Sequence, residues 1–77
     1  MNEKKDAIMI DCVATGQRIK GRRKAMCMSV CEFARQLGVH RIAVHKWESG
    51  DNFPDLNHVY MMSRILRCRM EDLVAGK

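Results

Sequence analysis

The sequence has few aromatic residues and little proline. Its 77 residues include one tryptophan, one tyrosine, two phenylalanines and one proline. A folded core must therefore be built mainly from Leu, Ile, Val, Met and Ala, and the apolar fraction of 47% is typical of a folding domain. No apolar run approaches the roughly 18 residues of a membrane span, and no signal-peptide core with a cleavage site is present. We expect a cytoplasmic protein with no membrane association.

The sequence also lacks a recognisable metal site or catalytic set. Cys27 and Cys31 lie four positions apart, with Cys12, Cys68 and three histidines elsewhere, whereas structural zinc sites show paired ligands at tighter spacings. Cytoplasmic cysteines stay reduced, so we expect buried, reduced thiols and no metal or cofactor. No nucleophile, base and orienting group are grouped as an enzyme requires. We expect neither catalysis nor a small-molecule ligand.

Basic residues exceed acidic ones. Fourteen Lys and Arg face nine Asp and Glu, which gives a net charge of +5 and favours a polyanionic partner. The charge is concentrated in the segment RIKGRRK, which holds Arg18, Lys20, Arg22, Arg23 and Lys24. A charge run is often only solvated surface, but Arg18 is the member of this segment that we expect to attract the phosphates of a polyanion.

The hydrophobic pattern predicts an all-α protein, because no segment alternates at a period of two. We expect a flexible N-terminal tail over residues 1–9 and a single domain over residues 10–77. Helices are predicted over residues 11–26, 30–37, 41–49, a stretch beginning at 56, and 70–75. The first and fourth helices are expected to bury one face each: Cys12, Thr15, Ile19 and Met26 on the first, and Leu56, Val59, Met62, Ser63 and Leu66 on the fourth.

Several helix ends are readable from local chemistry. Asp11 and Asp55 are N-cap residues, and Ser29 with Glu32 has the spacing of a reciprocal capping box. Gly38 and Gly50 follow predicted helices and suit the left-handed conformation of a helix end. Gly16 and Gly21 weaken the first helix locally, by up to about 1 kcal/mol each relative to alanine.

The segment from Val30 to Trp47 has the spacing of a helix-turn-helix. Ala34 is small enough for the second helix to approach, and Gly38 supplies a positive φ in the turn. Val44 and Trp47 lie three apart, so they anchor the second helix of the pair to the core. The remaining apolar positions of the pattern are Phe33, Leu37 and Val39.

At these residues the sequence resembles the Cro/repressor-type (Xre-like) helix-turn-helix domains of phage repressors and bacterial regulators. The likeness covers about residues 10–75, through GQRIKGRRKAM, MSVCEFARQLGV, HKWESG, PDL and MEDLV. It implies a five-helix, lambda-repressor-like domain that binds double-stranded DNA as a homodimer. It also implies an ion pair between Arg23 and Glu48, which fixes geometry more surely than it adds stability.

The sequence departs from the family pattern at several positions. His40 stands where relatives have Ser or Thr, which implies a weaker cap and an imidazole that faces a phosphate instead. Val30 replaces a common glutamine, although the amides at the start of the second helix remain available to a phosphate. Cys27 and Arg67 stand where relatives often have glycine, and we expect each to alter a helix end.

With Val44 and Trp47 inward, the opposite side of the third helix is expected to face DNA. We predict contacts to bases from Arg41, Ile42, His45 and Lys46, since the recognition helix enters the major groove. Ile42 suits a thymine methyl, with a stray surface isoleucine as the alternative. The predicted phosphate contacts are Arg18, Ser29, Val30, His40, Ser49 and Asn52.

These features predict a sequence-specific transcriptional regulator, most simply a repressor at a two-fold symmetric operator. The alternative is a protein-interaction module, such as an antitoxin-like or adaptor domain. Both roles are compatible with a partner such as a toxin. Phe53, Tyr60 and the C-terminal segment are candidates for the dimer surface.

Overall fold

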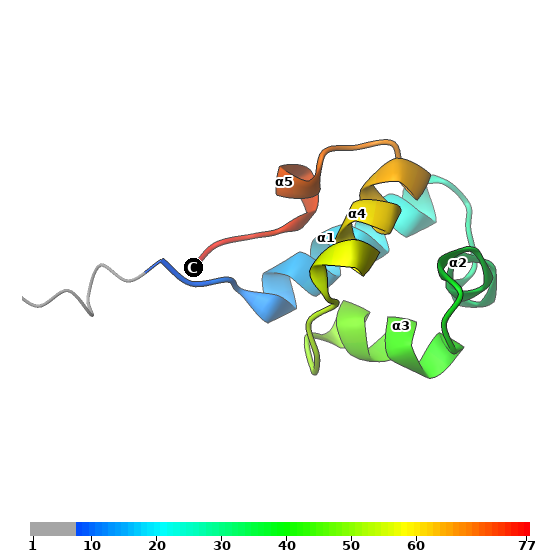
Figure 1. Cartoon of the computed structure of the whole chain (residues 1–77), viewed down its shortest axis with the longest axis horizontal. Coiled ribbons are helices and arrows are strands. Elements are labelled where there is room, and N and C mark those ends of the chain that lie inside the picture. Colours follow the sequence, from blue (N-terminus) through cyan, green and yellow to red (C-terminus); the bar gives the residue numbers. More distant parts are fainter. Residues whose placement is uncertain (1–7) are drawn as a thin grey trace, which may run out of the picture.

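Five helices pack around one core in the computed structural model, which describes residues 8–77 (Figure 1). They are α1 (Cys12–Ala25), α2 (Val30–Leu37), α3 (Arg41–Ser49), α4 (Leu56–Ile65) and α5 (Met70–Leu73). Within the described residues there is no strand, and the prediction of an all-α fold with five helices is confirmed. No helix in residues 8–77 is both long enough and apolar enough to cross a bilayer.

Side-chain caps set the starts of the first four helices. Asp11, Ser29 and Asp55 accept hydrogen bonds from backbone amides three residues ahead, at 3.0, 3.0 and 2.8 Å. The predicted capping box at Ser29 is half formed, because the Glu32 carboxylate binds the side chains of Arg35 and Gln36 instead of the Ser29 amide. Helix α5 ends at Leu73, two residues earlier than predicted.

The elbow between α2 and α3 has the predicted conformation. Gly38 ends α2 with a φ of 72°, and the Val39 amide donates to the Ala34 carbonyl at 3.0 Å. Gly50 ends α3 with a φ of 88°. A left-handed conformation is unstrained for glycine, so both helices stop where their glycines stand.

Two further helix ends take the same conformation without glycine. Cys27 and Arg67 have φ angles of 57° and 58°. The expectation that they alter the helix ends was wrong: both residues adopt the left-handed conformation that a glycine would take. A non-glycine residue pays about 1–2 kcal/mol for that conformation because its Cβ crowds the carbonyl oxygen that follows.

The core is aliphatic, with two aromatic rings. It comprises Ile19, Phe33, Ala34, Leu37, Val44, Trp47, Met62, Leu66 and Leu73. Four residues predicted to be buried are exposed: Leu56 (75%), Met26 (38%), Cys27 and Cys31. Leu56 is the first residue of α4, where the chain has not yet turned toward the core, and Met26 is the C-cap of α1.

Helices α1 and α3 touch at Gly16. A Cβ at this position would lie 2.5 Å from the carbonyl oxygens of both Trp47 and Glu48. Gly16 therefore lets the end of α3 rest directly on α1, which a residue with any side chain would prevent. Gly21, on the same helix, has open space around it.

The two ends of the described chain lie side by side (Figure 1). The Asp11 amide donates to the Ala75 carbonyl at 2.8 Å, and the Lys77 amide donates to the Met9 carbonyl at 2.9 Å. Ala75 is also held by its amide, which donates to the buried Thr15 hydroxyl at 2.9 Å. Of the tail predicted over residues 1–9, residues 1–7 lie outside the described residues, while Met9 is paired with the C-terminal segment.

Candidate nucleic-acid interface

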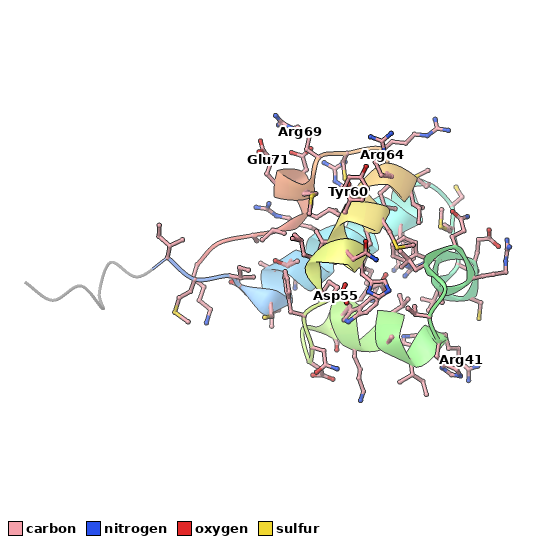
Figure 2. All side chains as sticks on the ribbon, viewed as in Figure 1. Arg41, Asp55, Tyr60, Arg64, Arg69 and Glu71 are labelled. Carbon is pink, nitrogen blue, oxygen red and sulfur yellow. The ribbon has the colours of Figure 1, made fainter. Side chains whose placement is uncertain are left out.

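Helix α3 has one sealed side and one open side. Val44 is fully buried and Trp47 is 9% exposed. The residues predicted to contact bases are all exposed and lie on the open side: Arg41, Ile42, His45 and Lys46. Ile42 is 52% exposed, and it is the apolar member of this otherwise basic group. Arg41 lies at the outer edge of α3, on the opposite edge of the molecule from Arg64 and Arg69 (Figure 2).

A buried ion pair fixes the C-terminal end of α3. The Arg23 guanidinium donates to the Glu48 carboxylate at 2.7 and 3.1 Å, and both side chains are at least 93% buried. The same guanidinium donates to the Met28 carbonyl at 2.7 Å. Arg23 thus joins α1, the turn before α2 and the end of α3, which holds α3 in one orientation relative to α2.

Trp47 is covered from the other side by α4. Its ring lies 5.2 Å from that of His58, whose Nδ1 is 2.8 Å from the Asp55 carboxylate. His58 therefore joins the Asp55 cap of α4 to the indole of Trp47, with the two rings tilted by 42°. This contact and the Arg23 pair hold the inner side of α3 against the rest of the domain and leave its outer side exposed.

His40 begins α3. Its Nδ1 accepts a hydrogen bond from the Ile42 amide at 3.1 Å, so the imidazole caps the helix. We expected the imidazole to face a phosphate instead of capping, and the structure shows the cap. At the other end, the Ser49 hydroxyl donates to the Lys46 carbonyl at 3.1 Å. Its proton is therefore already engaged within the protein.

The other predicted phosphate contacts lie at the ends of α2 and α3. The Ser29 hydroxyl accepts from the Glu32 amide, which leaves its own proton free to donate. Val30 opens α2 and packs its side chain against the core, so its contribution to an interface is its backbone amide. Asn52 is exposed in the loop after α3.

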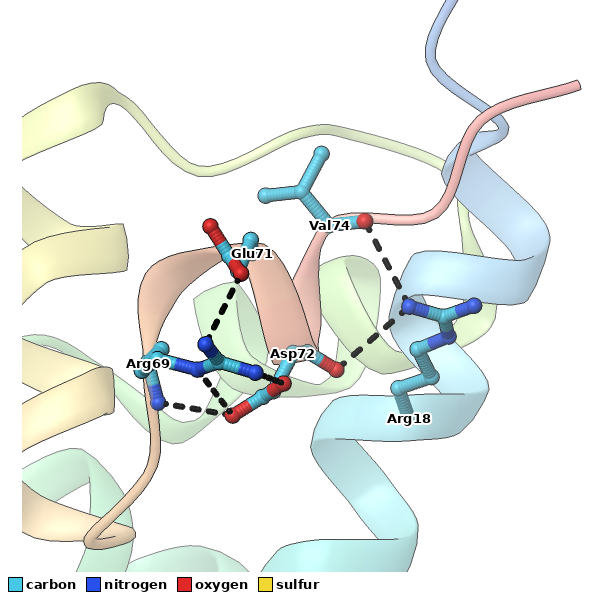
Figure 3. A network of polar contacts seen from close by, with 5 residues as sticks. All are labelled: Arg18, Arg69, Glu71, Asp72 and Val74. Atoms are coloured by element: carbon cyan, nitrogen blue, oxygen red, sulfur yellow. Dashed lines mark hydrogen bonds and ion pairs between the residues drawn. The ribbon is translucent and has the colours of Figure 1, made fainter.

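Arg18 lies elsewhere. Its guanidinium donates to the carbonyl oxygens of Asp72 and Val74, at 3.5 and 3.4 Å, beside a second cluster in which Arg69 binds Glu71 and Asp72 (Figure 3). The structure therefore does not bring Arg18 together with the exposed side of α3. Sequence reasoning missed this because a contact across more than 50 residues leaves no local signal.

The cysteines differ from the prediction that all are buried. Cys27 and Cys31 are exposed, and Cys12 and Cys68 are half-buried. Burial raises the pKa of the Cys68 thiol, although nearby Arg22 opposes this effect. Within residues 8–77, no three His, Cys, Asp or Glu side chains are grouped as metal ligands would be.

An apolar hollow lies beside α4 and α5, and the sequence predicted only part of it. Leu56, Tyr60 and Met70 line it together with Asn57, around a volume of about 380 Å³. Leu56 is 75% exposed and Tyr60 is 51% exposed. Tyr60 was a predicted candidate for a subunit contact, whereas Leu56 was assigned to the core because its spacing matches the buried face of α4.

The family comparison agrees with the geometry. A family model described as "Helix-turn-helix" matches residues 19–73. Repressor protein C2 of Salmonella phage P22 is 28% identical over 61 residues, and the regulator DicA of Escherichia coli is 32% identical over 53 residues. These matches cover 79% and 69% of this chain but only 28% and 39% of the two relatives.

Solved structures share the arrangement of the helices. The restriction-modification controller protein C.AhdI from Aeromonas hydrophila superposes with a TM-score of 0.77 at 27% identity, over 82% of this chain and 96% of that one. The P22 c2 repressor in complex with a synthetic operator gives a TM-score of 0.74 at 27% identity, over 77% and 89%.

Proposed function

This chain belongs to the helix-turn-helix family, and from that premise we propose that it is a sequence-specific DNA-binding transcriptional regulator. The observation that carries the proposal is that α3 is buried on one side and exposed on the other. Val44 and Trp47 are buried against the domain, while Arg41 and Lys46 are exposed. A rigidly held helix with an open basic side suits insertion into the major groove. The P22 repressor similar to this chain is solved with an operator, which supports the proposal.

Each residue of the open side has a distinct chemistry. Arg41, at the N-terminal end of α3, can donate two hydrogen bonds to guanine O6 and N7, a pairing that discriminates between bases by about 1–3 kcal/mol. Ile42 offers an apolar contact for a thymine methyl. His45 and Lys46 are one helical turn farther along, where they reach bases or the adjacent phosphates.

The phosphate contacts that we propose flank this surface. They are the Ser29 hydroxyl, the Val30 amide and Asn52. We assign His40 and Ser49 to the two ends of α3 instead, because their side chains bind backbone groups of that helix. Helix N-termini attract phosphates through their free amides, and Val30 is the first residue of α2. We do not assign Arg18 to the interface, because its guanidinium lies against the C-terminal segment.

We propose that the regulator acts as a homodimer in the cytoplasm and most simply represses by occupying its operator. Two copies would place their α3 helices about 34 Å apart, in successive major grooves, which requires a two-fold symmetric site. Leu56, Tyr60 and Met70 form the surface that we assign to the dimer, since water-exposed apolar groups gain from burial. One module alone buries roughly 600–1,000 Å² on DNA, so a second copy adds much to affinity.

Selection of bound duplexes from a random pool tests the function. We expect enriched sequences with two-fold symmetry. Binding should weaken steeply with salt because counterions are released from the DNA, whereas an apolar protein-interaction module would respond little. Recovery of no common sequence, with binding that ignores salt, would favour the alternative of a protein-interaction module, with a toxin-like protein as its partner.

A matched pair of variants tests the surface. Arg41→Ala should reduce discrimination at one base position by about 1–3 kcal/mol while binding to unrelated DNA changes little. Arg18→Ala removes the same charged group from a different face, so the selected sequence should stay the same. Both affinities are measured by fluorescence anisotropy. Equal discrimination by the parent and Arg41→Ala would contradict the assignment of α3.

A further inference from the structure

The first turn of α3 depends on a histidine. Its N-cap is His40, whose Nδ1 accepts the Ile42 amide hydrogen at 3.1 Å. An imidazole nitrogen can accept a hydrogen bond only while it carries no proton. The contact therefore requires neutral His40 with its proton on Nε2, and the cap is lost when the ring takes up a second proton.

The surroundings of His40 are positively charged. His40 lines a shallow hollow between α2 and α3 together with Cys31, Arg35 and Arg41. The Arg35 guanidinium is paired with the Glu32 carboxylate at 2.6 Å, whereas no ion pair is recorded for Arg41 within residues 8–77. A proton added to His40 would thus face the guanidinium of the residue that we assign to base recognition.

We propose that His40 is a positioning residue that makes base discrimination depend on pH. Neutral His40 holds the backbone of the first turn of α3 and so fixes the side chains of Arg41 and Ile42. Protonated His40 releases that turn and adds a positive charge beside the DNA. This inference rests on the proposed function, and it assigns to one side chain a control of specificity that is separate from overall affinity.

The two consequences of protonation act on different quantities. Specific binding needs Arg41 and Ile42 in register with base edges, so loss of the cap weakens it. Binding to unrelated DNA depends on charge and gains from the extra proton. The ratio of specific to nonspecific affinity should therefore fall when His40 gains a proton.

The experiment measures the affinities for the selected duplex and for a scrambled duplex at pH 5.5, 6.5, 7.5 and 8.0, at constant ionic strength. His45 also lies on the open side of α3 and is assigned to base contact, so every protein carries His45→Gln and the duplex is selected anew with that protein. His58 contacts Trp47 on the sealed side and is present in every protein. The test variants are His40→Ser, which keeps a cap that does not titrate, and His40→Ala, which has none.

We expect the ratio to fall about fivefold from pH 8.0 to 5.5 when His40 is present, the fold-change that corresponds to the loss of one typical N-cap. With His40→Ser the ratio should stay constant and high, and with His40→Ala it should be low at every pH. The same fall with His40→Ser, or full discrimination by His40→Ala at pH 8.0, would overturn the proposal.

A second measurement does not involve DNA. Nitrogen NMR of the free protein should show His40 with its proton on Nε2 at pH 8.0 and a loss of protection of the Ile42 amide against exchange on acidification. A proton on Nδ1 would overturn the proposal even if the chain selects an operator. Failure to select any duplex would instead refute the proposed function, with the imidazole spectrum unaffected.

Discussion

At the scale of single residues, two glycines in one helix have opposite effects on packing. Gly16 and Gly21 both belong to α1, and both lower its intrinsic stability because glycine is a poor helix former. At Gly16 the backbone of α3 occupies the space where a side chain would be, whereas Gly21 faces open space. Gly16 is thus a packing requirement, and Gly21 is a position that alanine would improve.

The two glycines give a matched prediction. Gly21→Ala should raise the free energy of unfolding by up to about 1 kcal/mol, the difference in helix propensity. Gly16→Ala should lower it by about 1 to 3 kcal/mol, because α1 and α3 must move apart to admit the methyl group. Urea denaturation followed by circular dichroism measures both values. An increase for Gly16→Ala would show that the two helices are not in contact as described.

At the scale of elements, the helices are set by their caps. Asp55 starts α4 and accepts hydrogen bonds from His58. The backbone amide of His58, more than its side chain, holds the pKa of the Asp55 carboxyl below its ordinary value of 3.8. A lowered pKa means that this contribution to stability is present above the unfolded-state value and is lost as the pH falls through the folded-state value.

Asp55→Ser tests this contribution, since serine caps a helix without titrating in acid. Between pH 5 and 2 we expect the midpoint of urea unfolding to fall less in Asp55→Ser than in the parent. Asp51→Ser makes the same substitution at an exposed loop position and should behave like the parent. Circular dichroism at each pH gives the midpoints. Parallel acid dependence in the parent and Asp55→Ser would mean that other carboxylates account for the acid sensitivity.

At the scale of the whole molecule, the open surfaces lie on different sides. The exposed side of α3 is basic, while the hollow formed by Leu56, Tyr60 and Met70 is apolar and lies beside α4 and α5. Buried contacts separate the two, since α3 rests on α1 and its Trp47 is covered by His58 of α4. One copy can therefore bind DNA with α3 while α4 and α5 remain available to a second copy.

Leu56→Asp tests the dimer. The leucine is 75% exposed, so its replacement should leave the fold of each copy intact. We expect weaker self-association and at least a tenfold weaker affinity for a two-fold symmetric duplex, with little change for a half-site. Sedimentation velocity and anisotropy measure the two effects. Ile8→Asp, at a residue 99% exposed and outside the hollow, is the control. A dimer that persists in Leu56→Asp would place the interface elsewhere.

Much of the fold followed from local chemistry. The helix starts at Asp11, Ser29 and Asp55 were predicted because a cap acts within three residues. The helix ends at Gly38 and Gly50 were predicted because a left-handed turn suits glycine. The open side of α3 was predicted because Val44 and Trp47 fix its rotation. The Arg23–Glu48 pair was predicted from a family resemblance, since its partners lie 25 positions apart.

The sequence by itself determined the helices, the elbow and which side of α3 faces outward, because these depend on residues within one or two turns of each other. The tertiary structure decided the rest: that the end of α3 packs on Gly16, that Arg18 contacts the C-terminal segment, and that Leu56 and Cys31 are exposed. Each of these depends on which distant atoms arrive beside a residue. The local sequence cannot specify that, because it does not contain the neighbour.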